Sequence, residues 1–227
     1  MRYDRIVEGT FISRPNRFIA ICEVDKETVT VHVKNTGRCK EILRSGVKVI
    51  LYYSDNPDRK TRYDLIAAYK GDMLINIDSQ APNAAFKEFI SSSGLFGKSP
   101  SVYPEYTHGD SRFDFYIEND DRKIFVEVKG VTLEHDGICS FPDAPTERGL
   151  KHLKGLQRTL EEGYECYVAF VIQMKPMRFF TPNYETHEDF GITLEEVNRA
   201  GVGILAYDCI VEPDSMVLDS PVPVRFR

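Results

Sequence analysis

The segment SRFDFYIENDDRKIFVEVKG, residues 111–130, decides the fold of this 227-residue chain. It contains two runs of alternating apolar and polar residues separated by residues 119–122, a pattern typical of two antiparallel strands and a tight turn. A two-residue turn at Asp120 and Asp121 fixes the register of the two strands. That register pairs Phe113 with Val128, Phe115 with Val126 and Ile117 with Ile124. The sequence therefore predicts a hairpin with one wholly apolar face.

The other face of the predicted hairpin carries charge. Asp114 is expected opposite Glu127, with Lys129 on the same face one step along the strand. Two carboxylates in that position repel each other, and a hard divalent cation such as Mg²⁺ or Mn²⁺ relieves the repulsion. An acidic pair, a metal ion and a neighbouring lysine are the groups that phosphodiester hydrolysis needs. The alternative is a solvated sheet face laced with salt bridges.

The elements around the hairpin indicate a mixed α/β domain. The order of the first six is α-β-β-β-α-β, with helices packed over one sheet. We predict helices over 84–92, 146–162 and 194–200, and strands over 101–107, 111–118, 124–131, 166–173 and 203–211.

The first part of the chain has a different pattern, of short β-rich segments separated by turns. Five such segments in about 70 residues favour a small closed barrel, and an OB-like five-stranded barrel fits this length. The predicted strands are 10–23, 28–33, 47–53, 64–69 and 73–77. We place the domain boundary near Pro82, which gives a barrel over 1–82 and the α/β domain over 83–227. No Gly/Ser linker separates them, so we expect the two domains to pack together.

Composition and charge narrow the class of protein. The net charge of -6 disfavours a nucleic-acid partner, but residues 1–84 hold 14 Lys and Arg against 11 Asp and Glu, and the rest hold 15 against 24. The five cysteines lack CxxC spacing, so we expect reduced structural thiols. Without a long apolar run or a signal peptide, we expect a soluble cytoplasmic protein that does not enter a membrane. Oligomeric state is not encoded in any of these features.

Several motifs together carry a resemblance to a known family. Asp114 followed by Glu127-x-Lys129 resembles the PD-(D/E)xK nuclease superfamily, although Phe113 stands where that superfamily has proline. The whole chain resembles the sugar fermentation stimulation protein (SfsA) family. The matching segments are SRPNRF (13–18), NTGR (35–38), NPDRKTRYDL (56–65), APN (81–83), SRFDFYIE (111–118), FVEVKGVTL (125–133) and FPDAPTERGLKHL (141–153).

This resemblance implies an N-terminal OB-like barrel and a C-terminal restriction-endonuclease-like domain. It also implies DNA binding without marked sequence preference and a regulatory link to sugar (maltose) utilisation. Residue by residue, the metal-binding carboxylates of the superfamily fall on Asp114 and Glu127, and its catalytic lysine falls on Lys129. Likeness of fold alone does not establish catalysis.

Basic residues near the turns of the barrel suggest a nucleic-acid surface, because OB barrels bind single strands with a basic groove and stacking aromatics such as Phe18. Our candidates are Arg14, Arg17, Arg38, Arg59, Lys60 and Arg62. In the helix 146–162, Arg148, Lys151 and His152 have the spacing to meet one phosphate. For each of these residues an ordinary solvated surface is the alternative, and for His152 it is the default. Glu88 and Glu105 are considered as additional metal ligands.

From the sequence we expect a DNA-binding protein with a Mg²⁺- or Mn²⁺-dependent nuclease centre, in which Asp114, Glu127 and Lys129 are catalytic. The main alternative is a DNA-binding regulator that keeps the nuclease fold without catalysing. A weaker alternative is a protein for RNA or for a small phosphorylated ligand.

Overall fold

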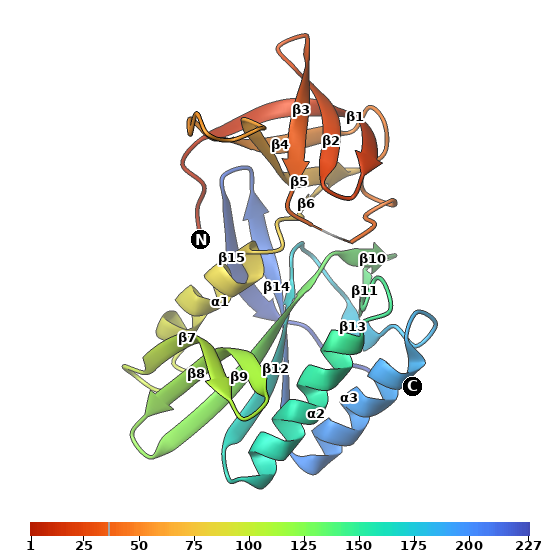
Figure 1. Ribbon diagram of the computed structural model, residues 1–227. Coiled ribbons are helices and arrows are strands. Elements are labelled where there is room, and N and C mark those ends of the chain that lie inside the picture. The colour runs from red at the N-terminus through yellow and green to blue at the C-terminus, as the bar shows by residue number, and fades with distance from the viewer. Residues whose placement is uncertain (36) are drawn as a thin grey trace.

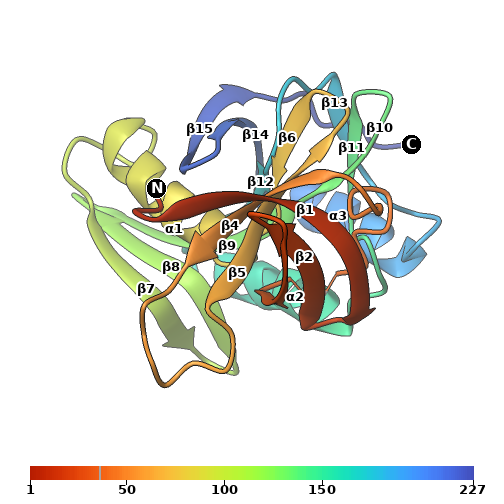
Figure 2. The same ribbon diagram turned by 90° about the horizontal axis from the view of Figure 1, so that it is seen from above.

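The computed structural model describes residues 1–35 and 37–227, which form two packed parts (Figure 1). A β-barrel made by the first part of the chain lies above a larger α/β domain. Seen from above, the barrel strands cross over the sheet of the larger domain (Figure 2).

The barrel is closed by five strands. Strand β1 pairs with β2 and β4, β2 pairs with β3, and β3 pairs with β5, which returns to β4. The strands are β1 (Ile6–Asn16), β2 (Ile19–Val24), β3 (Glu27–Val33), β4 (Lys48–Tyr53) and β5 (Tyr63–Lys70), and β6 (Met73–Asn76) pairs with β5 outside the closed ring. The predicted OB-like five-stranded barrel is confirmed. Closure leaves no long unpaired edge in the barrel.

One predicted barrel strand was wrong. Residues 10–23 form a hairpin rather than a single strand, because Asn16 stops β1 and its side-chain Oδ1 accepts hydrogen bonds from the amides of Phe18 and Ile19, at 2.9 and 3.1 Å. This is the asparagine turn chemistry that competes with strand continuation. The hairpin supplies the strand that the barrel would otherwise lack, since β6 does not take part in closure.

The second domain is built on a six-stranded sheet in the order β15-β14-β12-β9-β8-β7. Strands β9, β12 and β14 are parallel and the flanking pairs are antiparallel. The helices are α1 (Ala81–Ser92), α2 (Glu147–Glu161) and α3 (Glu188–Ala200). The sheet strands are β7 (Ser101–His108), β8 (Ser111–Asn119), β9 (Arg122–Val131), β12 (Glu165–Ile172), β14 (Gly203–Glu212) and β15 (Ser215–Pro221).

The predicted α-β-β-β-α-β order is present as α1-β7-β8-β9-α2-β12, so the restriction-endonuclease-like fold is confirmed. Helices α2 and α3 cover one face of the sheet and α1 covers the other (Figure 1). Four strands were not predicted: β15 and a small sheet of β10 (Leu133–His135), β11 (Ile138–Phe141) and β13 (Phe179–Pro182). No helix in the described part of the chain is long and apolar enough to cross a membrane.

The hairpin of β8 and β9 has the predicted register where the two strands pair. Phe115 lies opposite Val126 and Ile117 opposite Ile124, and the pairing continues to Asn119 and Arg122. The prediction that Phe113 shares the face of Phe115 was wrong. Phe113 packs with Phe125 in the core under α2, whereas Phe115 packs in the core under α1. The alternation of faces is thus broken at Asp114, where regular pairing with β9 stops.

The two domains are joined by polar contacts. The amide of Tyr3 donates to the carbonyl of Asp214 at 2.7 Å, and Nζ of Lys70 in β5 contacts the buried Glu134 of β10 at 2.5 Å. The predicted boundary at residue 82 falls in the first turn of α1. Through these contacts the barrel packs against the α/β domain.

Candidate metal centre and nucleic-acid interface

Asp114 lies where β8 leaves its pairing with β9. Its Oδ2 accepts a hydrogen bond from the backbone amide of Val128, and its Oδ1 accepts one from the side chain of Asn83 in α1, both at 2.8 Å. The carboxylate therefore takes the place of a backbone partner in the sheet ladder. This contact holds Asp114 beside the β9 segment that carries Glu127.

Glu127 is almost completely buried, with 2% of its surface exposed. Its Oε1 contacts Nζ of Lys129 at 2.5 Å and Nδ1 of His152, while Oε2 is buried with no hydrogen-bond partner among the described residues. A buried carboxylate oxygen without a donor is costly, and a bound water, a bound ion or a catalytic role can account for one. The orphaned Oε2 is the clearest sign that this centre is built for something besides stability.

The two carboxylates titrate differently. Burial raises the pKa of Asp114, and the negative charge of Glu127 adds to the effect. Burial also works to raise the pKa of Glu127, but the contacts with His152 and Lys129 outweigh it and hold that pKa below its usual range. Carboxylates whose environments drive their pKa values apart are a recognised mark of functional sites.

Helix α2 brings His152 to the centre. Thr146 caps the helix, with its Oγ1 accepting a hydrogen bond from the amide of Gly149 at 3.0 Å. Further along, a Cβ at Gly155 would lie 2.6 Å from Oγ of Ser111, so glycine lets the helix lie close against β8. On the exposed side, Nε of Arg148 lies 3.4 Å from Nε2 of His152. The chain of contacts thus runs from the surface at Arg148 to the buried Glu127.

The structure brings together the three predicted residues, Asp114, Glu127 and Lys129. It adds Asn83, which the sequence analysis did not single out, and His152, which was expected only as a phosphate contact or a surface residue. His152 is buried, not on the surface as expected by default, and its place on the leucine-lined face of α2 was the available signal. Asn83 lies in the APN motif, whose role nothing in the residue pattern reveals. Neither additional acid contributes, because Glu88 pairs with the N-terminal amine and Glu105 with Arg112.

The donor set fits a divalent cation of the hard, oxygen-seeking kind. Asp114 and Glu127 offer carboxylate oxygens, and one of these oxygens lacks a protein partner among the described residues. Among the described residues no three or more His, Cys, Asp or Glu side chains are placed to hold a metal ion together, so the rest of a coordination shell would be water, backbone or phosphate oxygen. Mg²⁺ is commonly bound in this way, through one or two carboxylates with several waters retained.

The predicted basic residues of the barrel fall into two groups. Arg14 and Arg59 are occupied within the protein. The guanidinium of Arg14 donates to the carbonyls of Arg17, Asn35, Gly37 and Arg38, at 2.6 to 2.9 Å. Arg59 makes a bidentate pair with the buried Asp64. The side chains of Arg17, Arg38, Lys60 and Arg62 are exposed, as are those of Arg148 and Lys151 on α2.

Three of the exposed basic residues, Arg17, Lys60 and Arg62, lie at turns of the kind that OB barrels use for nucleic acid. Arg17 lies in the β1–β2 turn, 4.8 Å from the ring centre of Phe18, which is 45% exposed. Arg62 and Lys60 lie in the β4–β5 connection. These two connections and the face between them are the usual oligonucleotide-binding region of the fold.

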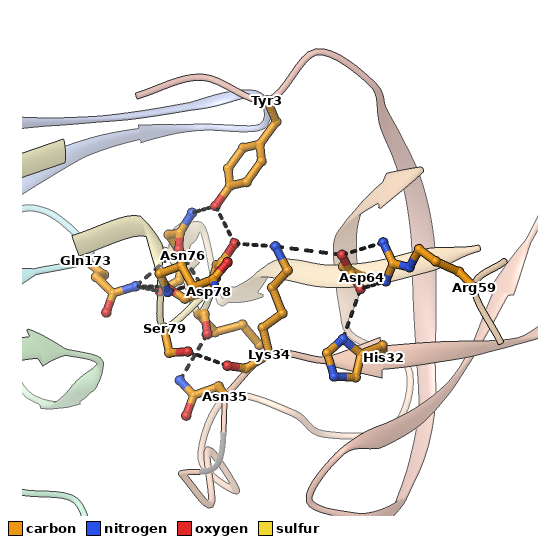
Figure 3. Close-up of polar contacts among 12 residues, drawn as sticks. Tyr3, His32, Lys34, Asn35, Arg59, Asp64, Asn76, Asp78, Ser79 and Gln173 are labelled. Carbon is orange, nitrogen blue, oxygen red and sulfur yellow. Dashed lines mark hydrogen bonds and ion pairs between the residues drawn. The ribbon is translucent and has the colours of Figure 1, made fainter. Parts of the chain in front are cut away.

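A buried polar network connects the barrel to the α/β domain (Figure 3). Nζ of Lys34 lies between two buried carboxylates, 3.2 Å from Asp78 and 3.7 Å from Asp64. Asp64 also accepts from His32, at 3.0 Å, and from Arg59. Burial works to raise the pKa of Asp64, but the contacts with Arg59, His32 and Lys34 hold it below its usual range. All four oxygens of this acidic pair have donors.

The remaining predictions about cysteines agree with the structure. All five cysteines are free and buried. Burial raises the pKa of Cys22, Cys39, Cys139 and Cys166 to about 12. Thiols with such pKa values are unreactive near neutral pH, so their role is packing.

The fold and the centre define a class of protein in which an OB barrel is followed by a restriction-endonuclease-like domain. Residues 12–77 match the family described as "SfsA N-terminal OB domain", and residues 80–215 match "Sugar fermentation stimulation protein RE domain". The chain belongs to the SfsA family of sugar fermentation stimulation proteins.

Curated relatives extend this match over the whole chain. The sugar fermentation stimulation protein homolog of Desulfitobacterium hafniense is 53% identical over 225 residues, covering 99% of this chain and 98% of the relative. The homolog of Clostridium beijerinckii is 51% identical, covering 99% of both chains. Among solved structures, SfsA of Pyrococcus furiosus, described as a complex with Ca²⁺, has a TM-score of 0.90 at 25% identity and covers 99% of this chain and 98% of its own.

Proposed function

We propose that this protein is a divalent-metal-dependent phosphodiesterase that acts on DNA held by the barrel. The observation that carries the proposal is the buried, donor-free Oε2 of Glu127 beside the second carboxylate, Asp114. The Ca²⁺ in the structure of the Pyrococcus furiosus relative supports a divalent cation in this family. For this chain we propose Mg²⁺ or Mn²⁺, both of which accept oxygen ligands of this kind.

In this proposal Asp114 and Glu127 hold the cation. A cation bound there supplies a water of lowered pKa and neutralises charge on a phosphate. Lys129 is partly exposed, with 13% of its side chain accessible, and its ammonium stabilises negative charge that develops on the scissile phosphate. His152 and Asn83 position the two carboxylates through the hydrogen bonds described above.

The barrel provides the nucleic-acid surface. The exposed Arg17 and Phe18 offer a cationic and an aromatic contact at one turn, and Lys60 and Arg62 add charge at another. Such contacts bind backbone and bases without reading sequence, which favours binding of DNA with little sequence preference. A role in sugar utilisation, as the names of the relatives suggest, would then act through DNA. The five free thiols support a reducing compartment, the cytoplasm.

The test is cleavage of single- and double-stranded DNA with Mg²⁺ or Mn²⁺, using wild type, Asp114→Asn and Lys129→Ala. We expect each substitution to slow cleavage by about 100-fold or more, the usual cost of removing one electrostatic catalytic group. Asp121→Asn is the matched control, since Asp121 lies exposed in the turn of the same hairpin. Equal residual cleavage by all four proteins would remove the catalytic claim, and DNA binding without cleavage would leave a regulator with a nuclease fold.

A further inference from the structure

A cavity lies between the barrel and the α/β domain, next to the candidate metal centre. Its volume is about 170 Å³, many times what one ordered water needs. The side chains that matter for its chemistry come from both domains. They are Ser79 on the barrel side and Thr132, Ser140, Asp143 and Gln173 on the other.

Gln173 presents a hydrogen-bond acceptor to the cavity. The residue is 2% exposed, and its Nε2 lies 3.0 to 3.2 Å from three acceptors, the carbonyls of Asn76 and Asp78 and Oδ1 of Asn76. Three acceptors fix the orientation of the amide, because only the NH₂ end can face them. Oε1 therefore points away from the network (Figure 3) and accepts no hydrogen bond from the described residues.

Some other side chains that line the cavity are also without hydrogen-bond partners among the described residues. Within 1–35 and 37–227, the side chains of Asp143, Ser140 and Thr132 make no hydrogen bond or ion pair with the protein. Asp143 and Gln173 offer acceptors only, and the two hydroxyls both donate and accept. Glycine at position 130 lets Oε1 of Gln173 lie close to β9, since a Cβ there would lie 2.5 Å from that oxygen. An occupant that donates hydrogen bonds would satisfy groups that are otherwise left open.

The cavity is within reach of the metal centre. Gly130 is three residues beyond Glu127 on β9, about 10 Å at roughly 3.3 Å per strand residue. On the barrel side, Ser79 also borders a second hollow, lined by Phe18, His32 and Lys34. A strand bound on the barrel thus has a route past the cavity to Asp114 and Glu127.

We propose that this cavity receives a single unpaired nucleobase of the strand held at the metal centre, and that it selects bases with an exocyclic amino group. Adenine, cytosine and guanine carry such a donor and thymine does not. A volume of about 170 Å³ is too small for a base pair, so in this proposal the substrate is single-stranded or locally unpaired at this position. This inference rests on the proposed function, because it places the base next to the phosphate to be cleaved.

The experiment is a base scan in full-length protein. Twelve-residue oligo-dT strands, each with one dC at a different position, are bound in EDTA and followed by fluorescence anisotropy. We expect dC at one position to tighten binding about tenfold, since its amino group offers two N–H donors to the acceptors of the cavity, whereas thymine offers only its N3–H, which lies between two carbonyl oxygens. The gain should vanish in Asp143→Ala and in Thr132→Val. It should persist in Asp136→Ala, which alters an exposed acid in the β10–β11 turn.

The outcomes separate this inference from the proposed function. Metal-dependent cleavage of the same strands with a flat scan would overturn the base cavity alone. A position-specific gain from dC without cleavage in Mn²⁺ would overturn the proposed nuclease alone. A gain that survives in both cavity variants would place the selected base elsewhere and overturn the inference, and absence of any binding would overturn both.

Discussion

Two acidic pairs in the described part of the chain contain a buried carboxylate beside a lysine, and they differ in whether every carboxylate oxygen has a donor. In the barrel, Asp64 and Asp78 have a donor for every carboxylate oxygen, with Lys34 between them. In the α/β domain, Asp114 and Glu127 leave Oε2 of Glu127 without a partner among the described residues. Burial alone therefore does not distinguish a structural cluster from a functional one. The distinction lies in whether the protein satisfies its own charges.

We expect the largest effect from a substitution in the pair of Asp64 and Asp78, whose carboxylate oxygens all have donors. Asp64→Asn should lower the free energy of unfolding by about 2–4 kcal/mol, because the partly buried Arg59 loses its counter-charge and Lys34 keeps only one of its two, Asp78. Cleavage per folded molecule should not change. Denaturant unfolding monitored by circular dichroism measures the first quantity.

The control for this substitution is Asp110→Asn. Asp110 forms an exposed ion pair with Arg158 at 2.7 Å, and such solvent-screened pairs contribute little to stability. Equal destabilisation by the two substitutions would contradict a structural role for the buried pair.

Removing His152 tests the other acidic pair, Asp114 and Glu127. In His152→Ala, Glu127 loses the contact that counteracts its burial, so its pKa rises and protons compete with the cation at higher pH. The acid limb of the cleavage profile should move to higher pH. Affinity for Mn²⁺, from the dependence of rate on its concentration, should fall by about 10- to 100-fold. The exposed His135 is the control, and an identical profile for His152→Ala and wild type would be evidence against a positioning role.

Acid unfolding should report on Asp64. Its pKa is lower in the folded protein than the usual value of about 3.9, so the ionised carboxylate stabilises the fold above that pH. This stabilisation is lost as pH falls through the folded pKa. Unfolding free energies measured from pH 6 to pH 2 should therefore fall more steeply for wild type than for Asp64→Asn. Parallel curves would show that the pair contributes nothing to acid sensitivity.

We expect the smallest effect from substituting arginines of the barrel. It should distinguish the exposed Arg17 from Arg14, which is bonded within the protein. Arg17→Ala should reduce the salt dependence of single-strand binding by about 0.7 in log–log slope, the amount expected for one phosphate contact. Arg14→Ala should leave the slope unchanged and lower stability, because that guanidinium anchors four carbonyls. The same slope change for both would mean that Arg14 also contacts the strand.

The hairpin of β8 and β9 shows what the sequence could predict. Alternation and a two-residue turn determine its register, and that register brought Asp114, Glu127 and Lys129 together. The break of alternation at Asp114 was not predictable, since it shows only in the tertiary packing, where Phe113 and Tyr116 both lie on Phe125. The extra strands β10, β11 and β13 are three or four residues long, too short for periodicity to identify.

The polar contacts that the sequence could not predict join residues far apart in the chain. The partners of Asp64 include His32, 32 positions away, and Gln173 reaches Asn76 across 97 positions. No local pattern indicates that Arg14 and Arg59 are occupied inside the protein while Arg17 remains exposed. Residue type predicted a basic barrel, and only the folded arrangement divides its charges between structure and surface.

The most direct test of the metal centre is calorimetric titration of Mn²⁺ into wild type, Asp114→Asn and Asp64→Asn. Both substitutions neutralise one carboxylate of an acidic pair that has a lysine nearby. We predict that wild type and Asp64→Asn bind Mn²⁺ alike and that Asp114→Asn binds it at least about 100-fold more weakly. Absence of binding to wild type, or equal binding to all three proteins, would contradict the assignment of Asp114 and Glu127 as a cation site.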